Sequence, residues 1–126
     1  MDFSLPADLA TLEERVRGFV SEEIVPMEGD ARRTAHGPSE DLRAELVEKA
    51  RRAGLLNPQV SRVFGGMGLS HLGKAVVLEA AGYSMLGPIA MNCAAPDEGN
   101  MHLMEEVATE AQKERFLRPM TEGRTR

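Results

Sequence analysis

The amino-acid sequence predicts an all-α fold, an antiparallel bundle of five or six helices that forms one domain over residues 1–126. Three observations support this prediction. Apolar residues recur at steps of three and four in several segments, capping residues precede those segments, and none of the segments alternates as a strand would. Short connections containing Pro or Gly favour antiparallel neighbours. The expected helices cover residues 7–33, 39–53, 70–84, 88–95, 97–107 and 109–122.

The first expected helix carries its apolar residues on one face. These residues are Leu9, Leu12, Val16, Phe19, Val20 and Ile24. Pro6 suits the first turn, because a helix leaves the N–H groups of that turn without partners. Pro26 is expected to kink or end the helix, with residues 27–33 as a helical continuation beyond the kink.

The second expected helix, residues 39–53, has the clearest signals. Ser39 is a suitable N-cap, and Glu40 and Asp41 complement the positive end of the helix. Gly54 suits the left-handed position after its last turn. The apolar face consists of Leu42, Leu46, Val47, Ala50 and Ala53. Ion pairs four residues apart are expected at Glu45–Lys49 and Glu48–Arg52.

The remaining elements follow from caps and chain breakers. The glycines of residues 64–68 predict a structural turn, since they match no known phosphate-loop pattern and follow no strand. Ser70 is expected to cap the third helix, whose apolar residues are Leu72, Ala75, Val76, Ala80 and Tyr83. Gly87-Pro88 opens a short apolar helix. Thr109 and Gln112 form a capping-box pattern before the last helix.

Composition excludes several classes of protein. The formal net charge is −5 and neither half of the chain is basic, so nucleic acid is not an expected partner. The apolar runs are far too short for a membrane span. Cys93 is the only cysteine, and residue 2 is an acidic Asp with no apolar segment after it. No internal disulfide and no signal peptide are therefore expected, which favours a cytoplasmic protein.

Few side chains suggest chemistry. His36, His71 and His102 are widely separated, so no metal site is expected. Cys93 lies in an apolar run with no neighbouring base, which predicts a buried, unreactive thiol. The segment 91–101 is small and apolar, and Pro96 and Gly99 interrupt it. It leaves room either for close packing or for a ligand, and its residue types alone leave both interpretations open.

Several short motifs carry a resemblance to a known family, and their order and spacing are more specific than any one of them. They are Ile24-Val25-Pro26, Ala53-Gly54-Leu55-Leu56, Phe64-Gly65-Gly66-Met67-Gly68-Leu69-Ser70, Glu79, and Gln112 through Pro119 with Gly123. Along almost its whole length the chain resembles the N-terminal helical domain of the acyl-CoA dehydrogenases. The stretch from Asn92 to Met101 further resembles the subgroup of family members ten and eleven. Phe64 stands where the family often has Tyr.

The resemblance implies an oxidoreductase of fatty acid metabolism, in which the whole enzyme desaturates an acyl-CoA thioester at its α,β bond. Family enzymes hold FAD between a β-domain and a C-terminal helical domain that follow the part present here. The resemblance therefore implies no catalytic residue, no flavin-binding residue and no metal ligand in this chain. It implies that the segment from Asn92 to Gly99 helps to line the acyl end of the substrate pocket. The candidate lining residues are Met91, Asn92, Ala95, Pro96 and Gly99.

Three interpretations follow for the chain as a whole. It is a truncated member that needs its β-domain and C-terminal helical domain, a free-standing helical binding module, or an interaction subunit that completes an active site with another chain. An apolar face left exposed would also permit a homo-oligomer.

Overall fold

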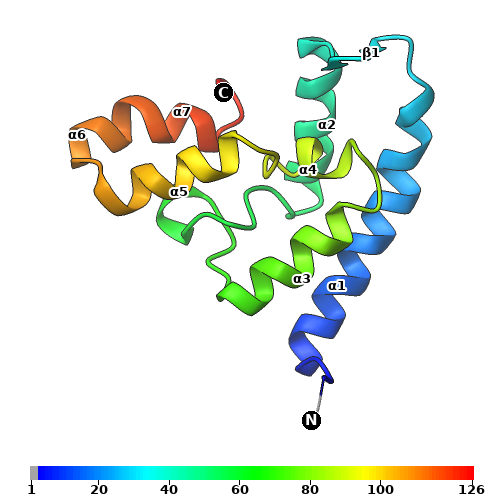
Figure 1. Cartoon of the computed structure of the whole chain (residues 1–126), viewed down its shortest axis with the longest axis horizontal. Helices are drawn as coiled ribbons and strands as arrows, with labels where there is room; N and C mark the ends of the chain where they lie inside the picture. The colour runs from blue at the N-terminus through cyan, green and yellow to red at the C-terminus, as the bar shows by residue number, and fades with distance from the viewer. Residues whose placement is uncertain (1–2) are drawn as a thin grey trace.

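The computed structural model describes residues 3–126, and it is mostly helical, which confirms the predicted fold class. The helices are α1 (Ala7–Phe19), α2 (Glu40–Arg52), α3 (His71–Ala81), α4 (Gly87–Ala90), α5 (Asp97–Val107), α6 (Glu110–Gln112) and α7 (Arg118–Thr121). Figure 1 shows α1 and α3 side by side at one end of the molecule, while α5, α6 and α7 form a hairpin that projects from the opposite side. Among residues 3–126, none of the helices is long and apolar enough to cross a membrane.

The first helix ends earlier than predicted. After α1 the chain continues as a π-helical turn (Val20–Ile24) and a 3-10 turn (Val25–Gly29), and the expected continuation to residue 33 is wrong. Pro26 has no N–H to donate, so the regular helical ladder cannot continue through it. Asp30 then accepts hydrogen bonds from the backbone N–H and the side chain of Arg32, and these bonds turn the chain.

A short antiparallel ribbon follows, which the sequence did not predict. Strand β1 (Arg33–Thr34) pairs with β2 (Gly37–Pro38) in the register Arg33↔Pro38 and Thr34↔Gly37. Gly37 has a φ of +114°, a backbone conformation that only glycine adopts readily. The ribbon returns the chain directly to the start of α2, as Figure 1 shows.

Helix α2 agrees with the prediction at both ends. The Ser39 hydroxyl accepts a hydrogen bond from the backbone N–H of Leu42, and Gly54 takes a φ of +69° just beyond the helix. The Glu48–Arg52 ion pair is present, but the expected Glu45–Lys49 pair is not. Glu45 binds Arg32 and Lys49 binds Glu23 instead. An exposed ion pair within a helix is worth only about 0.3–0.5 kcal/mol, so charged side chains of neighbouring segments compete for its members.

The buried face of α3 is rotated from the predicted one. Ser70 caps the helix through the N–H of Gly73, as expected. However, Leu72 and Tyr83 are exposed, and the buried side consists of Gly73, Val77, Ala80 and Ala81. A Cβ atom at position 73 would lie 3.2 Å from Leu69 and 3.4 Å from Leu9. Small residues therefore let α3 approach α1 closely, and the larger side chains are left outside.

The last elements differ mainly in their bounds. Helix α4 stops at Ala90, well short of the predicted residue 95, because Asn92 has a left-handed φ of +55° that ends the helix. Helix α5 has the predicted bounds. The final helical segment runs through α6, a π-helical turn (Lys113–Leu117) and α7. The capping box of Thr109 and Gln112 is confirmed in both directions.

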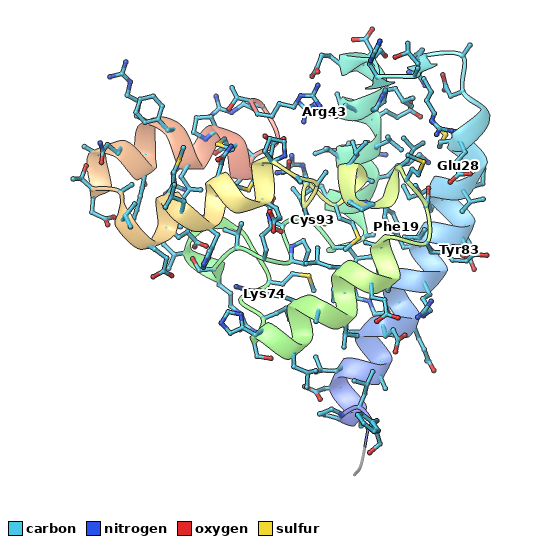
Figure 2. The ribbon with its side chains drawn as sticks, viewed as in Figure 1. Phe19, Glu28, Arg43, Lys74, Tyr83 and Cys93 are labelled. Carbon is cyan, nitrogen blue, oxygen red and sulfur yellow. The ribbon has the colours of Figure 1, made fainter. Side chains whose placement is uncertain are left out.

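The buried apolar residues form two clusters. The main cluster joins α1, α2, α3 and α4, and Leu42, Leu46 and Val16 are fully buried in it. A smaller cluster lies between the loop after α2 and the α5–α7 hairpin. Its buried members are Val60, Met101, Leu117 and Met120. The segment from Met91 to Pro96 connects the two parts, and Figure 2 shows Cys93 there, near the centre of the molecule.

Candidate functional site

Two buried asparagines hold the connecting segment in place. Asn92 Nδ2 donates to Asn57 Oδ1 at 2.8 Å and to the carbonyl of Met120 at 2.8 Å. Asn57 Nδ2 donates to the carbonyl of Thr121 at 2.6 Å. Both asparagines have a φ of +55°, which Asn tolerates better than most residues. These bonds tie together the loop after α2, the turn after α4 and the end of α7.

Backbone and glutamine contacts extend this network. The Asn57 N–H donates to the carbonyl of Met91, and Gln59 Nε2 donates to the carbonyl of Asn92 at 3.0 Å. The Oε1 atom of Gln59 is buried and has no hydrogen-bond partner among the described residues. A buried acceptor left unpaired costs about 1–3 kcal/mol. Gln59 therefore carries a buried oxygen that a water molecule or another hydrogen-bond donor would stabilise.

The structure separates the predicted lining residues into three places. Met91 is fully buried in the main cluster, and Asn92 is buried in the asparagine network. Ala95 and Pro96 are exposed at a cis peptide bond. Gly99 lies exposed in the first turn of α5, and a Cβ atom added there would meet no atom within 4 Å. The five residues belong to one segment, but they do not face one cavity of this chain.

Asn92, Ala95 and Pro96 line a cleft of about 470 Å³, named here the Pro96 cleft. Its opposite side carries Arg43, which is almost completely buried and which Figure 2 labels on α2. Arg43 Nε donates to Glu40 at 2.9 Å and its Nη2 donates to the carbonyl of Gly123 at 3.0 Å. The hydrogen bond from Arg43 holds the pKa of the Glu40 carboxyl below its ordinary value. Arg43 thus fixes the end of the chain beside this cleft.

Gly99 lines a separate cleft of about 340 Å³ between α3 and α5, the Gly99 cleft. Gln59, His71, Lys74 and His102 share it, and Figure 2 shows Lys74 on the side of α3 that faces α5. The same four residues also line a larger cleft, of about 610 Å³, which continues toward Lys113 and the acidic side chains of the hairpin. These two clefts are therefore neighbours with mixed charge, and the Pro96 cleft is distinct from them.

Reactive chemistry has little support in this arrangement. Cys93 is buried, as the sequence predicts. Burial raises the pKa of its thiol to about 12, with a further contribution from Glu98, which disfavours the reactive thiolate. In residues 3–126 there is no group of three His, Cys, Asp or Glu side chains placed to hold a metal ion. The described residues form a helical domain with solvent-exposed clefts between its elements.

Asn57, Gln59 and Arg43 each shape this region, although the sequence pattern did not predict a role for them. One available signal was Asn57-Pro58, because Asn tolerates left-handed backbone and favours turns before Pro. Gln59 and Arg43 gave no such signal, because a charged or polar residue within an amphipathic pattern is normally exposed.

Comparison with known proteins agrees with the resemblance seen in the motifs. A family model described as the acyl-CoA dehydrogenase N-terminal domain matches residues 6–124. FadE2 of Mycobacterium tuberculosis, described as a probable acyl-CoA dehydrogenase, is 35% identical over 100% of this chain and 32% of its own length. Acyl-CoA dehydrogenase family member 10 of Mus musculus is 34% identical over 91% of this chain and 12% of its own length.

A solved structure from Mycobacterium abscessus, assigned to the acyl-CoA dehydrogenases, superposes with a TM-score of 0.82 and 34% sequence identity. The superposition covers 98% of this chain and 34% of that one. The chain therefore belongs to the acyl-CoA dehydrogenase family and corresponds to its N-terminal domain. It spans about a third of the length of FadE2 and of the solved relative.

Proposed function

We propose that this chain is the N-terminal part of a flavin-dependent acyl-CoA dehydrogenase, and that the whole protein desaturates an acyl-CoA thioester between its α and β carbons. The match of the family model to residues 6–124 is the observation that carries this proposal. In the whole protein this domain supplies one wall of the acyl pocket through residues 92–99. The single buried thiol agrees with a reducing, cytoplasmic environment.

The implied cofactor is FAD, and the residues described here do not fit it. A flavin dinucleotide needs free N–H groups for its pyrophosphate, and glycine-rich turns commonly supply them. In this chain the N–H groups of residues 65–68 all donate to carbonyls of the loop, those of Arg62, Ser61, Asn57 and Val60. The turn is therefore closed by its own hydrogen bonds. We place the flavin contacts in the β-domain and C-terminal helical domain, or in a complementary subunit.

The contribution of this chain to substrate binding is structural. The asparagine network holds the Asn92 end of the short segment from Asn92 to Pro96. At the other end, the carbonyls of Ala94 and Pro96 accept hydrogen bonds from the backbone N–H groups of Glu98 and Asn100, so the segment forms a stiff surface. Ala95 and Pro96 present small, apolar groups on that surface. A stiff wall of small side chains suits an alkyl chain, because it excludes water without offering hydrogen bonds that the alkyl chain cannot return.

The test is an assay of the native gene product, read beyond codon 126, for acyl-CoA-dependent reduction of an artificial electron acceptor. We expect activity with the native product. We expect Ala95→Phe to lower kcat/KM about tenfold for the longest acyl chains accepted, because the larger side chain shortens the pocket. Ala44→Phe, on the exposed side of α2, is the matched control.

Two outcomes would contradict different parts of this proposal. A native product with no acyl-CoA-dependent activity would reject the desaturase function and favour a binding or interaction module. If Ala95→Phe leaves the activity unchanged, or lowers it equally for all acyl-chain lengths, the desaturase function would stand. The proposal that residues 92–99 form a wall of the acyl pocket would be rejected.

A further inference from the structure

Two clefts of this chain adjoin at one group of side chains between α3 and α5. The Gly99 cleft, of about 340 Å³, and the larger cleft, of about 610 Å³, are both lined by Gln59, His71, Lys74 and His102. Figure 2 shows Lys74 on the side of α3 that faces α5. Because they share these walls, the two clefts are treated as one groove, named here the α3–α5 groove.

One face of α5 gives this groove an excess of negative charge. Glu98 lines the Gly99 cleft, and Glu105 and Glu106 line the larger one. Within residues 3–126 none of these three carboxylates forms an ion pair, and neither does Lys74. The other lysine that lines the groove, Lys113, is already paired within the hairpin. Histidines apart, the described part of the groove has three unpaired carboxylates and one unpaired ammonium group.

The groove also contains a buried hydrogen-bond acceptor that lacks a donor. Gln59 is only 6% exposed, and its Nε2 lies 3.0 Å from the carbonyl of Asn92 and 3.4 Å from Met101 Sδ. These contacts fix the orientation of the amide, because a flipped amide would place Oε1 against the Asn92 carbonyl. Oε1 therefore occupies the other edge of the amide, where no described residue donates to it. A ligand that brings an N–H group would supply the missing donor.

The carboxylates and the amide oxygen require the same chemistry from a ligand. All of them are acceptors, and an ammonium group is both positively charged and rich in N–H donors. The carboxylates repel an anion such as phosphate, and a neutral alcohol leaves their charge unpaired.

The spacing along α5 restricts the ligand further. Glu98 and Glu105 are seven residues apart, which corresponds to about 10 Å along a helix. A linear diamine can place one ammonium group near each of them. Between its ends, the carbons can contact Ala75 and Leu78, which line the Gly99 cleft.

We propose that the α3–α5 groove binds a linear alkyl diamine or polyamine. One ammonium group donates to Gln59 Oε1 and pairs with Glu98, and the second pairs with Glu105 or Glu106. The backbone N–H of Ser61 donates to Glu105 Oε1 at 3.0 Å and so holds that carboxylate at the groove. Lys74 weakens the binding, because it places a like charge on the facing wall. The proposal does not depend on the desaturase activity.

Calorimetric titration of chain 1–126 and of the whole native product with 1,6-diaminohexane tests the proposal. The matched probe is hexamethonium, in which methyl groups replace every N–H while the chain length and the charge stay the same. We expect one diamine to bind per chain. Hexamethonium should bind at least about tenfold more weakly, because it cannot form charge-assisted hydrogen bonds. In chain 1–126, the diamine should shift the amide NMR signals of residues 71–78 and 98–106.

Four variants test the assigned contacts. Glu98→Gln and Gln59→Met should each weaken diamine binding about fivefold. Glu14→Gln, on the exposed side of α1, removes the same charge away from the groove and should change the affinity less than about 1.5-fold. Lys74→Met should strengthen the binding about threefold. Circular dichroism checks that each variant folds. Glu98→Gln carries the test if Gln59→Met, which also loses a bond to the backbone, does not fold.

Several outcomes would overturn the proposal. Equal affinity for 1,6-diaminohexane and hexamethonium would show that charge without hydrogen bonding accounts for binding. Equal effects of Glu98→Gln and Glu14→Gln would place the diamine outside the groove. Weaker binding in Lys74→Met would indicate an anionic ligand. Binding that is present in chain 1–126 and absent from the whole product would mean that another part of the protein fills the groove. An assay with acyl-CoA tests the desaturase separately, so the two proposals can fail independently.

Discussion

Asn92→Asp is expected to destabilise the chain by about 3–5 kcal/mol at neutral pH. Asn92 Nδ2 is the donor for two buried oxygens, Asn57 Oδ1 and the carbonyl of Met120. A carboxylate has no donor, so the substitution places a buried negative charge against two acceptors. Asn57 cannot compensate by flipping its amide, because its own Nδ2 already donates to the carbonyl of Thr121. The left-handed backbone itself tolerates Asp nearly as well as Asn.

Urea unfolding followed by circular dichroism measures this effect. Asn100→Asp is the matched control, since Asn100 is exposed on α5, and it should change stability by less than about 0.5 kcal/mol. Burial raises the pKa of the introduced carboxyl in the folded state above its unfolded value. The loss of stability is therefore full above the pKa of this carboxyl in the folded state. It shrinks as the pH falls, because the protonated carboxyl can again donate a hydrogen bond. A loss below about 1 kcal/mol at pH 7 would show that the asparagine network does not form.

Leu46→Ala should destabilise the chain by about 2–5 kcal/mol, the range for truncating a buried leucine. Leu46 has no exposed surface and lies in the main cluster between α2 and its neighbours. The loss of stability combines the transfer free energy of the deleted side-chain atoms with the cost of the cavity that remains. The unfolding midpoint in urea should fall accordingly.

Leu72→Ala is the control for this second prediction. The sequence pattern placed Leu72 on a buried face, but the structure leaves more than half of it exposed. Its truncation should cost less than about 0.5 kcal/mol. Equal losses of stability for Leu46→Ala and Leu72→Ala would mean that α3 buries the face predicted from the sequence. An unchanged midpoint for Leu46→Ala would show that the core face of α2 is misplaced.

The features that the sequence predicted well are local. Ser39, Ser70 and Thr109 cap helices through bonds to residues three positions away, so the information lies within one turn. The buried face of α2 was also predicted, because its stripe of Leu and Val is unbroken.

The features that it did not predict depend on contacts between distant segments. The buried face of α3 is set by the close approach of Gly73 to Leu9 and Leu69. The pairing of Lys49 with Glu23 depends on the π-helical turn beside α2. At the candidate site, a pattern of small residues interrupted by Pro96 and Gly99 marked the segment 91–101, but it could not show that Asn57 binds Asn92 across 35 positions. Nor could it show that Ala95 and Gly99 line different clefts.

The central claim is that this chain is a family domain whose flavin site lies in other parts of the whole protein. Titration of purified chain 1–126 with FAD, followed by flavin fluorescence and calorimetry, tests it most directly. We predict a colourless protein, no saturable change in either signal, and no reduction of an artificial acceptor with any acyl-CoA. Stoichiometric, submicromolar binding of FAD by the monomer would contradict the account, because the cofactor site would then lie within residues 1–126.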